Sequence, residues 1–163
     1  MSPDDLTTER TVTVPSGTPP AWMNEMMKRL LRTPGVGSWL GRRVALITWT
    51  GRRSGRRYTT PVSYYRNHGE VTLLTKRFRT WWRNFAEQPD VELRLAGEDI
   101  TGCARASVGD EDALPRLIGF LEHNAMDAKA FGVKLDADGR IDERDARALL
   151  PQVVVIEITL AQT

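Results

Sequence analysis

Two β-prone segments joined by an arginine-rich turn constrain the fold of this chain more than any other feature of its sequence. The first segment, residues 44–50, is apolar and ends abruptly at Gly51, and the second, residues 58–65, follows a short loop. Both segments are rich in β-branched and aromatic residues, which favour strands. The pattern therefore predicts a strand, a turn and a second strand.

The turn carries more charge than strand pairing alone requires, because residues 51–57 hold four arginines, one serine and two glycines. Gly51 and Gly55 allow positive φ angles, so successive backbone N–H groups can converge into a nest that binds an anion. Arginine adds planar, permanently charged donors that suit phosphate or carboxylate. We predict that this loop holds an anionic group of a ligand; the alternative is a solvated hairpin end whose arginines only maintain solubility.

The length of 163 residues predicts one domain that is large enough to bury its own core. We expect residues 1–19, which are polar and rich in Ser, Thr, Gly and Pro, to form a flexible arm, and residues 20–163 to form the domain. Cys103 is the only cysteine, so an internal disulfide is excluded. No apolar stretch approaches the ~20 residues of a membrane span and no signal peptide is evident, so the expected compartment is the cytoplasm.

Basic residues are concentrated in one part of the sequence, although the net charge is only +2. Residues 42–83 contain eleven basic residues and one acid, whereas residues 87–163 contain sixteen of the 21 acids. Such segregation favours a polyanionic partner. A basic nucleic-acid-binding module is one alternative, suggested by the aromatic residues among these cations. It does not explain the spacing of hydroxyl, glycine and proline residues, so we expect no nucleic-acid partner.

A helix is predicted to begin at Pro20 and to end at Pro34-Gly35. Its apolar residues recur at helical spacing, with basic residues on the other side: Trp22, Met23, Met26, Met27, Leu30 and Leu31. One interpretation is a helix that caps the barrel or sheet. The alternative is a basic amphipathic helix that rests on a membrane surface or a lipid-like substrate, which would make the protein membrane-associated.

The remaining pattern predicts an α+β fold. Strands are expected at residues 70–75, 91–95, 100–108 and 153–158, and helical segments near Trp81, between residues 110 and 124, and at residues 142–150. Most strands are neighbours in sequence, which favours antiparallel pairing, and closure into a barrel would leave no exposed edge. We therefore predict a single-domain barrel of mostly antiparallel strands, with an N-terminal helix and helices at the barrel ends.

A second informative cluster places Trp81 and Trp82 among the cations Lys76, Arg77, Arg79 and Arg83. Adjacent aromatic residues cannot face the same way on a helix, so one of the two is expected to anchor the core. The other can stack on a flat ring, with nearby cations holding the negative parts of that ligand. The alternative is that both tryptophans pack in the core.

Other chemical motifs are weak. Residues 134–145 partly match an EF-hand, but Lys134 stands at the first ligand position and Asp145 replaces the closing glutamate, so we expect a polar turn and no metal site. His68 and His123 have no evident metal partners and form no triad with a nucleophile. No catalytic side chain can be named from the sequence.

Residues 50–64 resemble the signature of the deazaflavin-dependent nitroreductases and quinone reductases. The segment Thr50-Gly51-Arg52-Arg53-Ser54-Gly55, then Thr59-Thr60-Pro61 and Tyr64, is similar to the family pattern T-G-[RK]-[RK]-S-G…T-x-P…Y. Trp81-Trp82-Arg83-Asn84-Phe85, followed by Pro89 and Val91, is similar to the family's W-Y-x-N-L…P-x-V segment. The similarity covers roughly the middle half of the chain.

The resemblance implies a split β-barrel that binds coenzyme F420, a deazaflavin with a phosphate and a polyglutamate tail. It implies hydride transfer from the reduced coenzyme to a quinone, a nitroaromatic compound or a similar small organic acceptor. The alternative within the same fold is a protein that binds FMN or a lipid-like ligand and has no F420 activity. Homodimers are common among split barrels, so the resemblance also favours a homodimer.

The resemblance further implies cofactor-binding roles for four groups of residues. The loop would hold the phosphate, the next strand would line the coenzyme, a Ser/Thr-Lys pair would lie at the deazaflavin ring, and the aromatic cluster would flank that ring and its side chain. In that order the residues are Arg53, Ser54 and Gly55; Thr60 and Pro61; Thr75 and Lys76; and Trp81, Trp82 and Asn84.

Two positions depart from the family pattern. The family has an arginine three residues before its proline, where this chain has Tyr58, and Arg57 lies one position earlier. Arg57 is included among the cofactor-binding candidates, although neighbouring residues of a strand face opposite sides. The family's G-G-A-P-type loop after the Ser/Thr-Lys pair is shortened here to residues 77–80.

Overall fold

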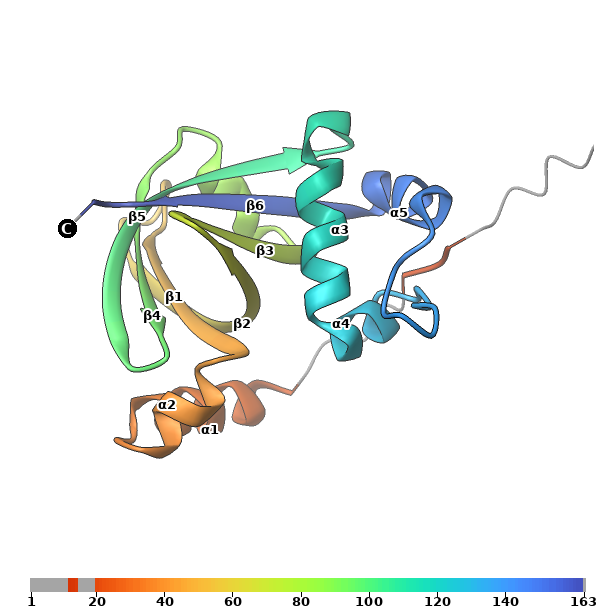
Figure 1. Ribbon diagram of the computed structural model, residues 1–163. Helices are drawn as coiled ribbons and strands as arrows, with labels where there is room; N and C mark the ends of the chain where they lie inside the picture. Colours follow the sequence, from red (N-terminus) through yellow and green to blue (C-terminus); the bar gives the residue numbers. More distant parts are fainter. Residues whose placement is uncertain (1–11, 15–19, 163) are drawn as a thin grey trace, which may run out of the picture.

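The computed structural model describes residues 12–14 and 20–162 (Figure 1). Most of the arm expected at residues 1–19 therefore lies outside the described residues. The part that is described packs against the helical side of the molecule. Val12 is buried there, and the side chain of Gln152 donates to the backbone oxygen of Val12 and accepts from the backbone N–H of Val14.

The described strands form a closed antiparallel barrel in the order β1-β2-β3-β6-β5-β4. Their bounds are β1 Val44–Thr50, β2 Arg57–Asn67, β3 Glu70–Lys76, β4 Asp90–Leu95, β5 Glu98–Val108 and β6 Val153–Leu160. The α+β barrel predicted from the sequence is confirmed, and each predicted strand lies within a few residues of its observed position. Closure pairs β1 with β4, so every strand of the described barrel has a neighbour on both sides along at least part of its length.

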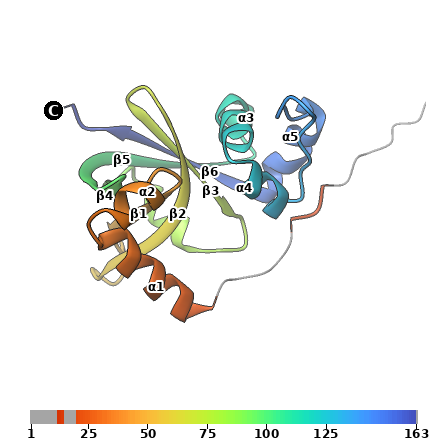
Figure 2. The ribbon, with the colours of Figure 1, turned by 60° about the horizontal axis from the view of Figure 1, so that its bottom comes forward.

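Helices cover the barrel on two sides (Figures 1 and 2). On one side lie α1 Ala21–Arg32 and α2 Val36–Leu40, and on another lie α3 Leu114–His123, α4 Ala125–Ala130 and α5 Glu143–Leu149. Short 3-10 turns occupy Trp81–Phe85, Glu111–Ala113 and Leu150–Gln152. The helices predicted near residues 20, 112 and 142 are confirmed, whereas the short helices α2 and α4 were not predicted.

The last strand shows how one apolar run serves two cores. Alternate side chains of a strand face opposite sides. Val154 and Ile156 therefore point into the barrel, while Val153 and Val155 pack on the outside against α3 and α5. A strand buried on both faces must be continuously apolar, which explains the run at residues 153–156.

Strand β2 changes its partner along its length. Its first half pairs with β1, from Thr50↔Arg57 to Val44↔Ser63. Its second half pairs with β3, but only from Tyr64↔Leu73 to Asn67↔Glu70. The first half of β2 and the end of β3, at residues 75–76, are therefore not hydrogen-bonded to each other, and the barrel is split at this place.

Candidate active site at the barrel mouth

The arginine-rich loop is a tight connection held by two backbone hydrogen bonds. The N–H of Gly51 donates to the oxygen of Arg56 and the N–H of Gly55 donates to the oxygen of Gly51, both at 2.8 Å. Gly55 has a positive φ of 65°, as the sequence predicts. The backbone N–H groups of Arg53 and Ser54 find no acceptor among the described residues, so two donors of the expected nest are available.

The sequence predicts that Gly51 is needed for a positive φ angle, and this reason was wrong. Gly51 does not have a positive φ. What requires glycine here is space, because a Cβ would lie 2.6 Å from Oγ of Ser54 and 2.8 Å from a ring carbon of Tyr58. The hydroxyls of Ser54 and Tyr58 are hydrogen-bonded at 3.1 Å, so this close approach fixes the shape of the loop.

The structure joins the loop to the tryptophan cluster that follows β3. The N–H of Arg52 donates to Oδ1 of Asn84 at 3.0 Å, and Nδ2 of Asn84 donates to the backbone oxygen of Trp81 at 2.8 Å. A cavity of about 540 Å³, here called the loop cavity, lies between the two segments and is lined by Trp49, Gly51, Arg52, Arg53, Ser54, Tyr58, Thr80, Trp81, Arg83 and Asn84. Two clusters that the sequence singled out separately therefore form one site.

An aromatic group forms one side of the loop cavity. The ring of Trp49 lies 5.2 Å from Trp81, 5.8 Å from Tyr58 and 5.9 Å from Phe85 between centroids. Phe85 is fully buried and Trp81 packs against the barrel core. Trp81 thus has the position expected of the tryptophan that anchors the core, while remaining at the cavity surface.

Trp82 lies outside the lining of the loop cavity. Its Nε1 donates to the backbone oxygen of Arg77 at 3.4 Å, and the guanidinium group of Arg83 lies 5.6 Å from its ring centroid. Trp82 is half-buried and packs against the barrel core. The adjacent tryptophans therefore have different surroundings, although each touches the core.

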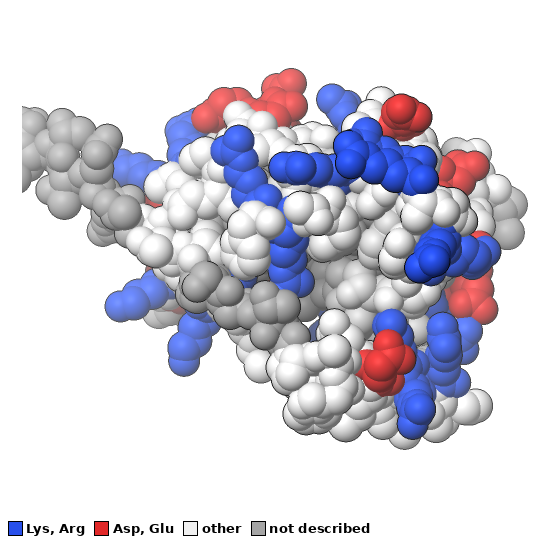
Figure 3. Space-filling view, turned by 180° about the vertical axis from the view of Figure 1, so that it is seen from behind, with Lys and Arg blue, Asp and Glu red and all other residues white. Residues whose placement is uncertain are grey.

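The loop cavity has a positive electrostatic character. Arg52, Arg53 and Arg83 line it, and among the described residues none of the three forms an ion pair with a carboxylate. Lys and Arg side chains also form a band across one face of the molecule, with acidic side chains mostly around its edge (Figure 3). Unneutralised guanidinium groups beside free backbone donors suit phosphate and carboxylate groups.

The Ser/Thr-Lys pair lies at the split between β2 and β3. Alternate residues of a strand face opposite sides of the barrel, so Thr75 and Thr60 face the interior, whereas Lys76 and Pro61 face outward. Thr75 is buried, and its hydroxyl has no partner among the described residues. Burial, together with the nearby Arg79, lowers the pKa of Lys76.

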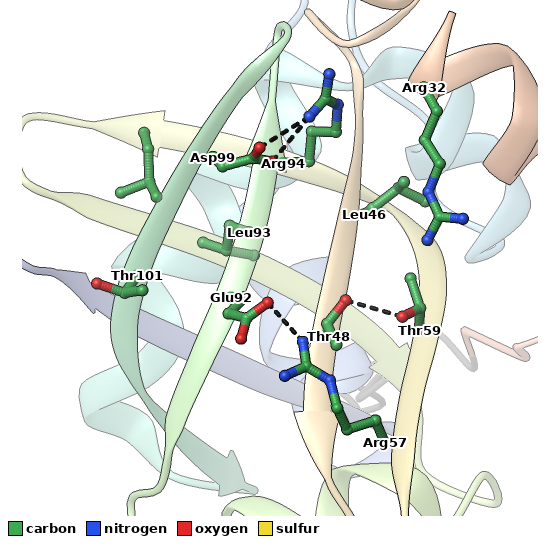
Figure 4. Close-up of a pocket in the computed structure, with 11 residues that line it drawn as sticks. Arg32, Leu46, Thr48, Arg57, Thr59, Glu92, Leu93, Arg94, Asp99 and Thr101 are labelled. Atoms are coloured by element: carbon green, nitrogen blue, oxygen red, sulfur yellow. Dashed lines mark hydrogen bonds and ion pairs between the residues drawn. The ribbon is translucent and has the colours of Figure 1, made fainter.

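Arg57 lies apart from the loop cavity, on the outer wall of the barrel (Figure 4). It donates to Glu92 at 2.6 Å across β1 and lines a second cavity of about 610 Å³. This wall groove is lined by Arg32, Leu46, Thr48, Arg57, Thr59, Glu92, Leu93, Arg94, Asp99, Ile100 and Thr101. Strand alternation turns Arg57 to the side opposite Tyr58, so the structure separates it from Arg53 and Ser54.

The polar residues of the partial EF-hand match and His123 make local contacts. Oδ1 of Asp136 accepts from the N–H groups of Asp138 and Arg140, which closes a polar turn before α5. His123 packs on Tyr65 with ring centroids 5.0 Å apart. In the part of the chain that the structure describes, no group of three or more His, Cys, Asp and Glu side chains is arranged to hold a metal ion.

A comparison with protein families shows to which family this chain belongs. Residues 22–137 match the model of the F420H(2)-dependent quinone reductase family. The chain belongs to that family. The match includes the loop, both strands beside it and the tryptophan turn, and it assigns the protein to a family of oxidoreductases whose name implies F420 as cofactor and a quinone as acceptor.

Solved structures show the same fold at low identity. The F420-H2 dependent reductase FDR-A is 15% identical, with 72% of this chain and 94% of that chain covered and a TM-score of 0.52. A pyridoxamine 5′-phosphate oxidase-related, FMN-binding protein from Nostoc punctiforme is 12% identical, with 88% and 82% covered and a TM-score of 0.51. A structure described as a domain-swapped dimer is 17% identical, with 84% and 96% covered and a TM-score of 0.54. A comparison with curated proteins finds no match.

The residues at the barrel mouth fit the coenzyme that the family name implies. The unpaired guanidinium groups match a phosphate and several carboxylates, and the aromatic surface matches a flat ring. Two buried donors have no partner among the described residues: Nε1 of Trp49, which lines the loop cavity, and the hydroxyl of Thr75, which lies at the split between β2 and β3. A buried polar atom is costly unless it is hydrogen-bonded, so a polar ligand that reaches either donor would stabilise it.

None of the described helices is both long enough and apolar enough to cross a bilayer.

Proposed function

We propose that this family member reduces a quinone or a nitroaromatic compound with F420H2 bound at the loop cavity. The single observation that carries the site assignment is the loop cavity itself, where unneutralised arginines face an aromatic surface. The coenzyme has two matching parts, a negatively charged tail and a flat ring.

The phosphate of the coenzyme is assigned to Arg53, Ser54 and Gly55. This assignment is supported by the two unused N–H groups of the loop and by the left-handed backbone of Gly55, which lets successive N–H groups converge. The side chain of Arg53 adds a charge-assisted hydrogen bond. Asn84 holds the loop against the tryptophan turn, so we assign it a positioning role at the cavity.

The ring is assigned to the split between β2 and β3 and to the tryptophan turn. Thr75 offers a hydroxyl and Lys76 a cation there, Thr60 and Pro61 form the facing strand, and Trp81 and Trp82 supply aromatic surface. When bound, the reduced coenzyme supplies a hydride, and the protein contributes binding, orientation and exclusion of water. Because the coenzyme supplies the hydride and the protein only binds and orients the reactants, no catalytic triad is needed.

A reduction assay tests the proposal. Purified protein is mixed with F420H2 and menadione, and oxidation of the deazaflavin is followed by absorbance; a nitroaromatic acceptor is compared in parallel. We expect turnover with F420H2, and weaker coenzyme binding in Arg53→Ala and Lys76→Ala with the fold intact. Arg66→Ala is the matched control, because Arg66 is exposed on β2 beyond the split.

Two results would contradict the proposal. Unchanged coenzyme affinity in both Arg53→Ala and Lys76→Ala would refute the site. Binding of FMN in place of F420 would refute the cofactor in this chain and would favour the FMN-binding alternative, since a structurally similar protein is described as FMN-binding.

We also propose that the chain forms a homodimer, as the sequence resemblance implies. A structural neighbour is described as a domain-swapped dimer, which supports this proposal by similarity of fold. Light scattering coupled to size exclusion measures the mass directly. A mass near the 18.4 kDa of one chain at all concentrations would contradict it.

A further inference from the structure

Helix α1 has an apolar arc that is wider than the part covered by the protein. At 3.6 residues per turn, Trp22, Met26 and Leu30 form one stripe along the helix, and Met23, Met27 and Leu31 form the adjacent stripe. The second stripe faces the protein, because Leu31 is 3% exposed and the two methionines are half-buried. The first stripe has no such cover.

The uncovered stripe is among the most exposed apolar surfaces of the described chain. Trp22 is 65% exposed, Met26 45% and Leu30 37%, and Val36 of the neighbouring α2 is 46% exposed. A single exposed apolar side chain needs no explanation, but a continuous row of large ones is uncommon on soluble proteins. The row runs the length of α1, from its first turn to its last.

The polar side of α1 is basic. Lys28, Arg29 and Arg32 stand against one acid, Glu25. Glu25 pairs with Lys28 at 2.7 Å, and this contact together with the nearby arginines lowers the pKa of Glu25. Arg29 borders the exposed stripe one turn after Met26 and makes no ion pair with a carboxylate among the described residues. The stripe is therefore flanked by positive charge.

We propose that α1 docks the protein on the surface of an anionic lipid bilayer, with the Trp22–Met26–Leu30 stripe in the boundary between headgroups and acyl chains. A basic amphipathic helix with tryptophan at the interface is suited to this position. With 12 residues, α1 is too short to span a bilayer, so it lies along the surface.

The arrangement of the helices permits this contact. α1 and α2 lie together on one side of the barrel, away from α3, α4 and α5 (Figures 1 and 2). A flat bilayer can therefore approach α1 without meeting the other helices. The proposal does not rest on the identity of the electron acceptor, although a membrane surface is where a lipid-soluble acceptor would concentrate.

A second copy of the chain fits the stripe less well. The four exposed side chains together offer a few hundred Å² of apolar surface, whereas a standard interface buries about 800 Å² on each partner. Positive charge beside the stripe would also face positive charge in a symmetric pair. An anionic bilayer satisfies both the apolar row and the adjacent cations.

Vesicle sedimentation with the full chain tests the proposal. Wild-type protein is mixed with vesicles of phosphatidylcholine alone or of phosphatidylcholine with phosphatidylglycerol. We expect binding to the anionic vesicles, weaker binding to the neutral ones, and a decrease with added salt. Met26→Glu is expected to weaken binding to anionic vesicles by about tenfold, because it places a charge in the apolar stripe.

The matched control is Met126→Glu, the same substitution at a methionine of α4 that is 78% exposed. It should change vesicle binding by less than about twofold. Absence of wild-type sedimentation, or equal binding by the two variants, would overturn the proposal. A wild-type dimer that Met26→Glu converts to monomer, without any vesicle binding, would also overturn it and would assign the stripe to a second copy. F420 affinity should be unchanged in both variants, so failure here is distinguishable from failure of the coenzyme site.

Discussion

The loop cavity and the wall groove are similar in size and in residue types, but they differ in the partners of their arginines. The wall groove measures about 610 Å³, and each of its two strand arginines is paired with a carboxylate at 2.6–2.9 Å. The loop cavity measures about 540 Å³, and its three arginines have no carboxylate partner among the described residues. The floors differ too, since one is aromatic and the other is formed by strand threonines and aliphatic residues.

The number of arginines around a cavity therefore does not by itself define an anion site. A guanidinium group already paired with a carboxylate must lose that partner before it can bind a phosphate, whereas an unpaired one loses only water. Two of the three arginines in the wall groove are neutralised by carboxylates, whereas none of the three in the loop cavity is, and this separates the cavity we assign to the coenzyme from a groove of similar size.

The aromatic floor gives the largest expected effect. Trp81→Ala should lower the free energy of unfolding by about 3 kcal/mol, because it removes the contacts with Trp49 and Phe85 and leaves a cavity beside the core. Trp82→Ala should cost less, about 1 kcal/mol, because Trp82 packs against the same core but makes no ring contact with Trp49 or Phe85 among the described residues. Urea denaturation of both variants measures the difference. Equal losses would contradict the distinction between the two tryptophans.

The close approach at Gly51 gives the next effect. Gly51→Ala should destabilise the protein by about 2 kcal/mol, because the new Cβ overlaps Ser54 and the Tyr58 ring. Gly69→Ala is the control, since a Cβ there meets nothing within 4 Å and its φ is not positive. Its expected change is below about 0.5 kcal/mol. A tolerated Gly51→Ala, judged by thermal unfolding, would mean that the loop is not held by steric contact.

A half-buried carboxylate, Asp127, tests the same principle with a negative charge. Burial raises the pKa of Asp127 above its ordinary value near 3.8, only partly offset by the hydrogen bond that Ser63 donates at 3.1 Å. The folded state thus favours the protonated form, so this group's contribution to stability is lost as pH rises from about 4 through the raised pKa. Asp127→Asn should remove that loss and be relatively more stable at pH 7 than at pH 4. Unfolding measured across this range would contradict the account if the variant kept the wild-type pH dependence.

The ion pair of the wall groove gives the smallest expected effect. Arg57 and Glu92 are both exposed, so a double-mutant cycle with Arg57→Ala and Glu92→Ala should give a coupling of about 0.2–1 kcal/mol. The coupling should shrink at high salt. A coupling well above that range would mean that the wall groove is more desolvated than its exposure indicates.

Much of the fold followed from patterns that are local in the sequence. Alternation and turn residues predicted every strand of the described barrel, and the run at residues 153–158 predicted a strand without revealing that it is buried on both faces. The helix α4 was missed because Asn124 interrupts a helical stretch: its side chain donates to Tyr64 and Phe120, which ends α3 and starts a six-residue helix. Such a break depends on a partner 60 residues away.

The site was only partly predictable for the same reason. The loop and the tryptophan cluster were each recognised from composition, but their union depends on the hydrogen bond between Arg52 and Asn84, which are 32 residues apart. Arg57 was grouped with the loop because it is adjacent in sequence, whereas its partner Glu92 is 35 residues away on β4. Sequence proximity could not show which side of the barrel each arginine faces.

Titration with F420, followed by fluorescence, shows whether the loop cavity binds the coenzyme when the wild type and two variants, Arg53→Ala and Arg57→Ala, are compared. Wild-type protein should bind F420 in preference to FMN. Arg53→Ala should raise the Kd by about tenfold or more, since it removes a charge-assisted hydrogen bond, while Arg57→Ala should change it by less than about twofold. The opposite order of the two variants would contradict the assignment and would place the coenzyme tail in the wall groove; no F420 binding by the wild type would contradict the account as a whole.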